Sequence, residues 1–207
     1  TLPTNDPRYY DMVKGINSEV SANCFQWNKA LQARKSYIMN HPKKIELARK
    51  ILNYRADKKA ITFSATIKQA EKIGNGYVVH SGKTKKKNRL TMEEFAPLMF
   101  GAIHTSKSLD EGADVPGLNL AIVLCNSSSK TQKTQRVGRV IRHEEGKEAE
   151  IFTLVLKGTQ EMSWYDTSTS GKPYIEINED ELHGILTGVE LVREKEVAKE
   201  SDLLFRL

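Results

Sequence analysis

Three side chains in the C-terminal half of the chain have types and a spacing that suit phosphate chemistry. The stretch TQKTQRVGRVIRHEEG begins at Thr131 and is rich in glutamine and basic residues. If it is helical, at about 100° of rotation per residue, then Gln135, Arg139 and Arg142 share one narrow stripe. Two arginines one turn apart on a stripe of this kind can hold a phosphoryl group through paired hydrogen bonds.

A solvated basic surface is the alternative interpretation of this charge run, and Lys130 and Lys133 remain candidates for that role. Such a surface usually mixes lysine with glutamate. The stripe instead combines glutamine and arginine, and Val137, Val140 and Ile141 lie on the opposite side of the helical wheel. We therefore expect the stripe to face an anion.

A second group of residues could contact a sugar and a phosphate. A strand-like run ends at Thr105 and Ser106, and the segment LDEGADVP follows, in which Gly112 and Pro116 bracket Asp114. A tight loop would present this carboxylate at the carboxyl edge of a sheet, where it can accept hydrogen bonds from a ribose while the two hydroxyls donate to a phosphate. An ordinary aspartate turn is an equally good interpretation.

The segment Ser81–Thr84 reads SGKT and ends like a nucleotide-binding P-loop. That motif needs a glycine at the position of Tyr77, and Gly76 lies one residue too early. The intervening Tyr-Val-Val-His favours a strand, whereas a phosphate cradle needs a permissive backbone. Asp110-Glu111 follows a polar stretch rather than a strand, so the sequence also lacks an expected magnesium-binding acid pair. An independent NTPase site is not indicated.

The elements that must position these residues alternate between short apolar strands and helices. This alternation predicts an α/β fold with a mainly parallel sheet that helices cover on both faces, and with its working surface at the carboxyl ends of the strands. The expected strands are Ala60–Ala65, Tyr77–His80, Ala102–Thr105, Leu120–Leu124 and Glu150–Leu156. The expected helices are Tyr9–Asn40, Lys43–Arg55, one that ends near Ile73, Leu90–Met99 and Thr131–Arg142.

The alternation fades after Lys157. Ser163–Pro173 is expected to be a loop, Tyr174–Ile177 an edge strand, and the sequence from Asp180 onward helical. Trp164 is better explained as a core residue than as a base-stacking one. We divide the chain into a helical arm or interdomain linker segment (1–41), a motor-type domain (42–158) and a C-terminal extension (159–207).

Composition narrows the class of protein. The 207 residues carry a net charge of +6, which favours polyanionic partners. The two cysteines fit no ligand spacing and the five histidines form no metal-binding pair, so we expect no metal held by cysteine or histidine, and a reducing compartment. The longest apolar run, Leu120–Cys125, is far too short to cross a membrane, and we expect no secretory signal.

Four segments in order carry a family resemblance: ITFSAT, VVHSGKTKKKNR, HTSKSLDEGADVP and QRVGRVIR. Together they resemble motifs of superfamily 2 helicases and translocases, and all four belong to the second, C-terminal RecA-like motor domain. The resemblance covers about Lys43–Leu156. Its style, with QRVGR and DEGADVP, is closer to DNA-repair, restriction and phage members than to DEAD-box RNA enzymes.

The resemblance implies half of an ATP site. Arg142 matches the arginine finger, Arg139 its companion at the terminal phosphates, and Gln135 the neighbouring interdomain residue. Gly112 and Asp114 match positions at the ribose and the interdomain cleft. ATP and Mg²⁺ would be bound mainly by an N-terminal RecA-like motor domain that this chain lacks, so the isolated chain is expected to be inactive as an ATPase.

The resemblance also implies nucleic-acid contacts at three strand ends. The matching positions are Ser64, Ala65, Ser81, Gly82, Thr105 and Ser106, and Arg89 matches an arginine with a structural role. The expected partners are DNA, with RNA as the alternative, and the first motor domain. No membrane partner is expected, and the expected location is the cytoplasm of a bacterial or phage-infected cell. Two alternatives stay open: a stand-alone nucleic-acid-binding module without ATPase activity, and a small P-loop kinase that uses Gly82-Lys83-Thr84.

Overall fold

Five parallel strands form the centre of the part of the protein that the structure describes. The computed structural model describes residues 6–106, 115–126, 149–169 and 174–189. The strands pair in the order β2-β3-β1-β4-β5, and every pairing is parallel. This confirms the α/β fold with a mainly parallel sheet. The strands are β1 Lys59–Ser64, β2 Tyr77–His80, β3 Gly101–Ser106, β4 Leu120–Val123 and β5 Glu150–Thr153.

The two faces of the sheet bury separate apolar clusters. Alternate residues of a strand point to opposite faces, so neighbours such as Ala60 and Ile61 belong to different clusters. Helix α4 (Lys85–Phe95) covers one face, and the fully buried Phe95 packs there against Ile61 and Ile103. Helices α2 (Pro42–Tyr54), α3 (Ile67–Ile73) and α7 (Glu179–Leu186) contribute to the cluster on the other face. The prediction of helices on both faces is therefore confirmed.

Helix α4 is shifted from its predicted position, Leu90–Met99. It begins five residues earlier because the Thr84 hydroxyl caps it, accepting a hydrogen bond of 3.2 Å from the Lys87 amide. It ends at Phe95, two residues before Pro97, because proline has no backbone N–H with which to continue the helical hydrogen bonds. The lysine-rich segment after Gly82 is thus the first turn of a helix.

Two predictions for the C-terminal segment are wrong. Helix α6 (Gln160–Thr169) occupies most of the predicted loop Ser163–Pro173. It remains helical because the hydroxyls of Thr167 and Thr169 donate to carbonyls one turn earlier, so these polar side chains do not compete with the helix. Tyr174–Ile177 pairs with no strand in the part of the chain that the structure describes; Ile177 instead packs against the apolar cluster under α2 and α7.

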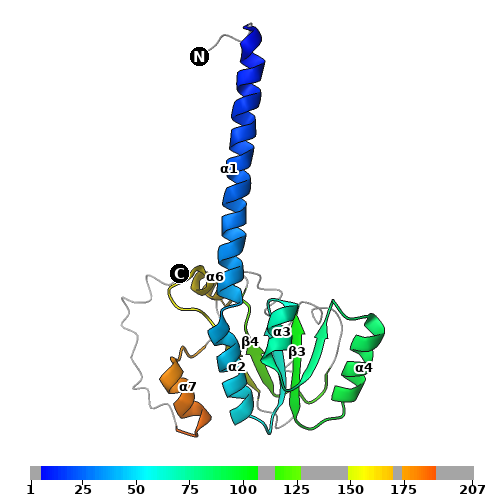
Figure 1. The fold of residues 1–207 in the computed structure, drawn as a ribbon. Coiled ribbons are helices and arrows are strands. Elements are labelled where there is room, and N and C mark those ends of the chain that lie inside the picture. The colour runs from blue at the N-terminus through cyan, green and yellow to red at the C-terminus, as the bar shows by residue number, and fades with distance from the viewer. Residues whose placement is uncertain (1–5, 107–114, 127–148, 170–173, 190–207) are drawn as a thin grey trace, which may run out of the picture.

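Helix α1 (Pro7–Met39) is a rod of 33 residues that rises away from the carboxyl edge of the sheet (Figure 1). Its length agrees with the predicted helix Tyr9–Asn40. Ile16, Val20 and Trp27 are exposed by 52%, 54% and 66%, whereas Ile38 at the base is buried. Among the described residues, no helix combines the length and apolarity that a membrane span needs.

A buried ion pair joins α2 to α6 at the carboxyl end of β4. The Lys44 ammonium lies 2.5 and 2.7 Å from the two carboxylate oxygens of Glu161, and both side chains are at most 4% exposed. The same ammonium donates to the carbonyl of Leu124, while the carboxylate accepts from the Asn126 amide and the backbone N–H of Leu156. Burial lowers the pKa of Lys44, and the charge of Glu161 opposes that shift. Each charge is stable only because the other is present.

Removing one partner should therefore be far more damaging than removing both. Lys44→Met leaves an uncompensated buried carboxylate, and we expect it to lower the free energy of unfolding by about 3–5 kcal/mol. Lys44→Met combined with Glu161→Gln should recover at least half of that loss. Urea titration of the purified chain measures both values.

Lys43→Met is the matched control, because the Lys43 side chain is 40% exposed and its pairs with Glu46 and Glu179 lie at the surface. That change should cost less than about 1 kcal/mol. Equal losses for Lys43→Met and Lys44→Met would show that the buried pair has no special role in stability.

Candidate functional site

The residues predicted from three strand ends lie together at the carboxyl edge of the sheet. The parallel register aligns Ser64 of β1 with Ser106 of β3, and Ser106 with His80 of β2. Ala65 follows β1 directly, and the turn Ser81–Gly82 follows β2. The six predicted nucleic-acid contacts therefore belong to one continuous edge, although they are spread over more than forty residues of sequence.

Two of these residues differ in how their hydroxyls are used. Ser64 is 1% exposed, and its side-chain oxygen has no hydrogen-bond partner in the part of the chain that the structure describes. The Thr105 hydroxyl donates to the carbonyl of Thr62 at 3.0 Å, so it links β3 to β1 beneath the edge. A buried hydroxyl without a partner is unfavourable. Ser64 thus has an unused donor directly under the edge.

The loop after β1 is fastened to the end of the long helix α1. Gln69, which is buried in α3, accepts a hydrogen bond of 2.8 Å from the Ala65 amide and donates one of 2.9 Å to the carbonyl of Met39. The hydroxyl of Thr66 donates to the side-chain oxygen of Asn40 at 2.7 Å. The base of α1 and the loop Ser64–Thr66 are therefore held by one set of hydrogen bonds.

Gln69 was missed in the sequence, although a local signal for it exists. Thr66 and Gln69 have the spacing of a helix capping box, in which a hydroxyl caps the helix and a glutamine or glutamate reaches back. The Thr66 hydroxyl does accept from the Gln69 amide at 3.2 Å. The glutamine side chain reaches one residue further back than the motif requires, to Ala65. The motif could have identified the cap, but not the bond to Met39.

A polar layer lies beneath α3, one step inside the edge. His104 is buried; its Nδ1 lies 3.0 Å from the Thr62 hydroxyl and its Nε2 lies 2.8 Å from the carbonyl of Gly74. A carbonyl only accepts, so Nε2 carries the proton and Nδ1 accepts from the hydroxyl. Burial lowers the pKa of His104, and hydrogen bonds to the backbone of Gly74 and Asn75 partly oppose the shift. The imidazole is neutral in the folded protein near neutral pH.

The segment SGKT does not form a phosphate cradle. Lys83 donates its ammonium to the carbonyl of Val78 at 2.5 Å, and the Thr84 hydroxyl caps α4. Both side chains that a P-loop would direct at phosphate are used within the fold. Arg89, expected to be structural, lies on the exposed surface of α4. Its Nε lies 3.4 Å from Oε1 of Glu93.

The predicted nucleotide-side residues lie outside the described residues. These are Gly112, Asp114, Gln135, Arg139 and Arg142, so their arrangement stays a prediction. Trp164, predicted in the core, is partly buried in α6, and the ammonium of Lys35 of α1 lies 5.6 Å from its ring centre.

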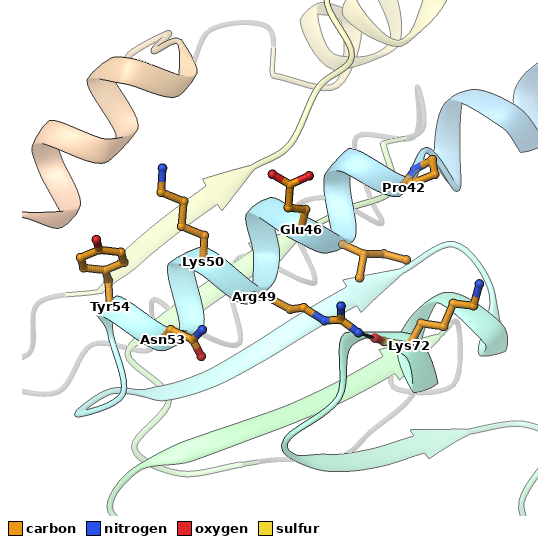
Figure 2. Close-up of a pocket in the computed structure, with 8 residues that line it drawn as sticks. Pro42, Glu46, Arg49, Lys50, Asn53, Tyr54 and Lys72 are labelled. Atoms are coloured by element: carbon orange, nitrogen blue, oxygen red, sulfur yellow. Dashed lines mark hydrogen bonds between the residues drawn. The ribbon is translucent and has the colours of Figure 1, made fainter.

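A groove of about 770 Å³ on the outer side of α2 contains none of the predicted site residues. Figure 2 shows Arg49 reaching from α2 toward the end of α3, where it donates to the carbonyls of Lys72 and Ile73. Its guanidinium thereby caps the carboxyl end of α3. The groove is lined by Pro42, Ile45, Glu46, Arg49, Lys50, Asn53, Tyr54 and Lys72.

Comparisons with known proteins agree with the resemblance of the motifs. A family model described as the ERCC3/RAD25/XPB C-terminal helicase matches residues 17–175. The DNA 3'-5' translocase XPB2 of Sulfurisphaera tokodaii is 33% identical over 136 residues, which cover 64% of this chain and 30% of that protein. The XPB subunit of the general transcription and DNA repair factor IIH of Schizosaccharomyces pombe is 31% identical over 138 residues, covering 61% of this chain and 17% of that protein.

The chain therefore spans less than a third of the length of these relatives. Among solved structures, the C-terminal domain of the DEAD-box protein Dbp5 superposes with a TM-score of 0.57 at 17% identity. That superposition covers 70% of this chain and 89% of that domain, and it shows the fold alone.

Because the imidazole of His104 is buried, we expect the free energy of unfolding to depend on pH. The unfolded chain binds a proton as the pH falls through about 6.5, whereas the folded chain resists protonation, so acid favours unfolding. Between pH 6.5 and about 5, the free energy of unfolding should fall by up to about 1.4 kcal/mol per pH unit from this group. His104→Gln should remove this slope in urea titrations, while His183→Gln, which alters an exposed histidine, should not. Equal slopes in the two variants would contradict the assignment.

Proposed function

Because the chain belongs to the ERCC3/RAD25/XPB C-terminal helicase family, we propose that it is the moving half of an ATP-driven DNA translocase. It is the second, RecA-like motor domain of a superfamily 2 helicase or translocase. In the proposal, its carboxyl edge grips one strand of the nucleic acid. Its arginine stripe completes an ATP site whose other half lies on the first motor domain.

The clustering of polar side chains at the carboxyl edge is the observation that supports binding of a nucleic-acid strand there. Ser64, Ser81 and Ser106 end or follow three adjacent parallel strands, and the buried Ser64 hydroxyl has no partner among the residues that the structure describes. Hydroxyl donors suit phosphate oxygens and carry no base recognition. Binding by such an edge would be largely independent of sequence, as a tracking motor requires.

The sequence pattern supports the ATP role. Gln135, Arg139 and Arg142 share a stripe on the predicted helix, and the resemblance assigns Arg142 as the arginine finger. An arginine finger accelerates phosphoryl transfer by roughly 10³ to 10⁵, because it stabilises the charge that develops on the γ-phosphoryl group. Gly112 and Asp114 would lie at the ribose and the interdomain cleft.

ATP and Mg²⁺ would be held mainly by the first motor domain. The side chains of the described SGKT segment support this division, since Lys83 is bonded to the carbonyl of Val78 and Thr84 caps a helix. The bound nucleotide supplies the free energy of hydrolysis. This chain supplies the closing surface and the arginines, and opening and closing of the two domains moves their strand grips relative to each other.

DNA is the proposed substrate, because the names of both relatives refer to DNA. Competition between single-stranded DNA and RNA oligonucleotides of the same sequence decides this point. Tighter binding of RNA would redirect the proposal to an RNA motor. The stand-alone binding module remains the second candidate, and ATPase activity in a protein that joins both motor domains would exclude it.

Arg142→Ala tests the ATP role in the protein that carries both motor domains. We expect ATP hydrolysis to fall by at least about 10³, while affinity for DNA stays within a few-fold, since the arginine faces the nucleotide. Lys130→Ala, from the same basic run, is the control and should keep its ATPase activity. A loss of DNA binding with normal ATPase would overturn the assignment of Arg142.

Ser81→Glu tests the carboxyl edge. The added charge would face the phosphate backbone, so we expect the affinity of the chain for a labelled single-stranded oligonucleotide to fall by about tenfold or more. Asn53→Glu adds the same charge to an exposed position at the carboxyl end of α2, beside the opposite edge of the sheet. Fluorescence anisotropy should show little change for that variant. Equal weakening by both changes would indicate a general charge effect and no grip at the edge.

A further inference from the structure

The turn Ser81–Gly82 is fixed from inside by the residue that precedes it. His80 ends β2 and is 5% exposed. Its Nδ1 accepts a hydrogen bond of 3.1 Å from the Gly82 amide, and its carbonyl accepts one of 3.1 Å from the Lys83 amide. The same carbonyl accepts a second bond, of 2.9 Å, from the Asn88 side chain, so the turn is also connected to α4. Backbone and side chain of one residue thus define the turn.

Packing around Gly82 is tight, so a side chain there would require its neighbours to shift by a few tenths of an ångström. A Cβ added there would lie 3.0 Å from Nδ1 and 3.2 Å from Cε1 of His80, and 3.2 Å from Cδ1 of Ile67. These separations are shorter than ordinary van der Waals contacts. The imidazole is therefore packed against the glycine backbone, between the turn and α3.

The hydrogen bond from Gly82 determines the state of the ring. An amide N–H only donates, so Nδ1 holds a lone pair and the neutral imidazole carries its proton on Nε2. Nε2 is buried and has no hydrogen-bond partner among the described residues, although Glu71 Oε1 lies 3.3 Å away. One ring nitrogen thus bonds to the turn, and the other lies beside Glu71 of α3.

We infer that His80 is a positioning residue, which holds the Ser81–Gly82 turn in the shape that binds a nucleic-acid phosphate. His80 is buried and acts through Gly82, while Ser81 and Gly82 are exposed. Because Nδ1 draws the Gly82 amide inward, Ser81 occupies the outer corner of the turn. This inference rests on the proposed function, since it names the residue that prepares one of the strand contacts.

Two isosteric variants separate the two ring nitrogens. His80→Asn places its amide oxygen near the position of Nδ1, so it keeps an acceptor for Gly82 and loses the contact with Glu71. His80→Gln places its amide near Nε2, so it loses the acceptor and keeps the contact with Glu71. Both replace the ring by a neutral amide and remove comparable packing. A merely structural role in the core would affect them similarly.

Binding of the chain to a labelled single-stranded DNA oligonucleotide is the first measurement. His80→Gln should bind about fivefold more weakly than the unmodified chain, the size expected for one lost hydrogen bond. His80→Asn should stay within about twofold. Urea titration should show that the two variants have similar stability.

Hydrogen exchange of the Gly82 amide is the second measurement and does not depend on binding. The amide should be protected in the unmodified chain and in His80→Asn, and should exchange faster in His80→Gln. Equal DNA affinity or equal Gly82 exchange in the two variants overturns the inference but leaves the proposed function standing. If the unmodified chain does not bind nucleic acid at all, the proposed function fails, and the inference fails with it.

Discussion

The buried pair of Lys44 and Glu161 is the constraint on which the carboxyl edge depends. It joins residues 117 positions apart and includes the carbonyl of Leu124, just after β4. Helix α6 contributes few apolar contacts to the sheet, and Glu161 is its fully buried residue. A charge removed from water requires its partner in a defined place, whereas apolar contacts tolerate small shifts. The pair therefore fixes where α2 and the β5–α6 segment meet the end of β4.

The long helix α1 is attached to the same edge and not to the sheet as a whole. Asn40 and the Met39 carbonyl bond to Thr66 and Gln69, and Lys35 lies over the ring of Trp164 in α6. Ala65 is one of the proposed nucleic-acid contacts. A tilt of α1 would strain the hydrogen bond between Ala65 and Gln69. The base of α1 and the proposed nucleic-acid-binding edge should therefore move together, even though most of α1 is exposed.

The sequence predicts the elements whose signal is local. Runs such as Tyr77–His80 and Leu120–Val123 are identified by apolar β-branched residues, and α1 by its length and periodicity. Helix α6 was missed because hydroxyls that usually favour loops bond here to its own carbonyls. Glu161 could not be found in the sequence, since its partner is distant and a lone glutamate is normally exposed. The family motifs predicted the nucleic-acid contacts at the ends of β1, β2 and β3. These contacts lie at one edge because the strands are parallel and in register.

The face of the sheet beneath α3 shows how the fold combines stability with a polar edge. Two successive rows of polar side chains cross this face. The first contains Thr62 and His104, and the second contains Ser64, Ser106 and His80. A sheet that served stability alone would carry apolar side chains at these positions. Helix α3 is only seven residues long and is held at its two ends, by Thr66 and by Arg49. Hydrogen bonds at these ends replace the apolar contacts that the polar rows cannot supply. Places where a sequence departs from apolar packing are expected at functional sites. Here that departure occurs under the edge where the proposed contacts lie.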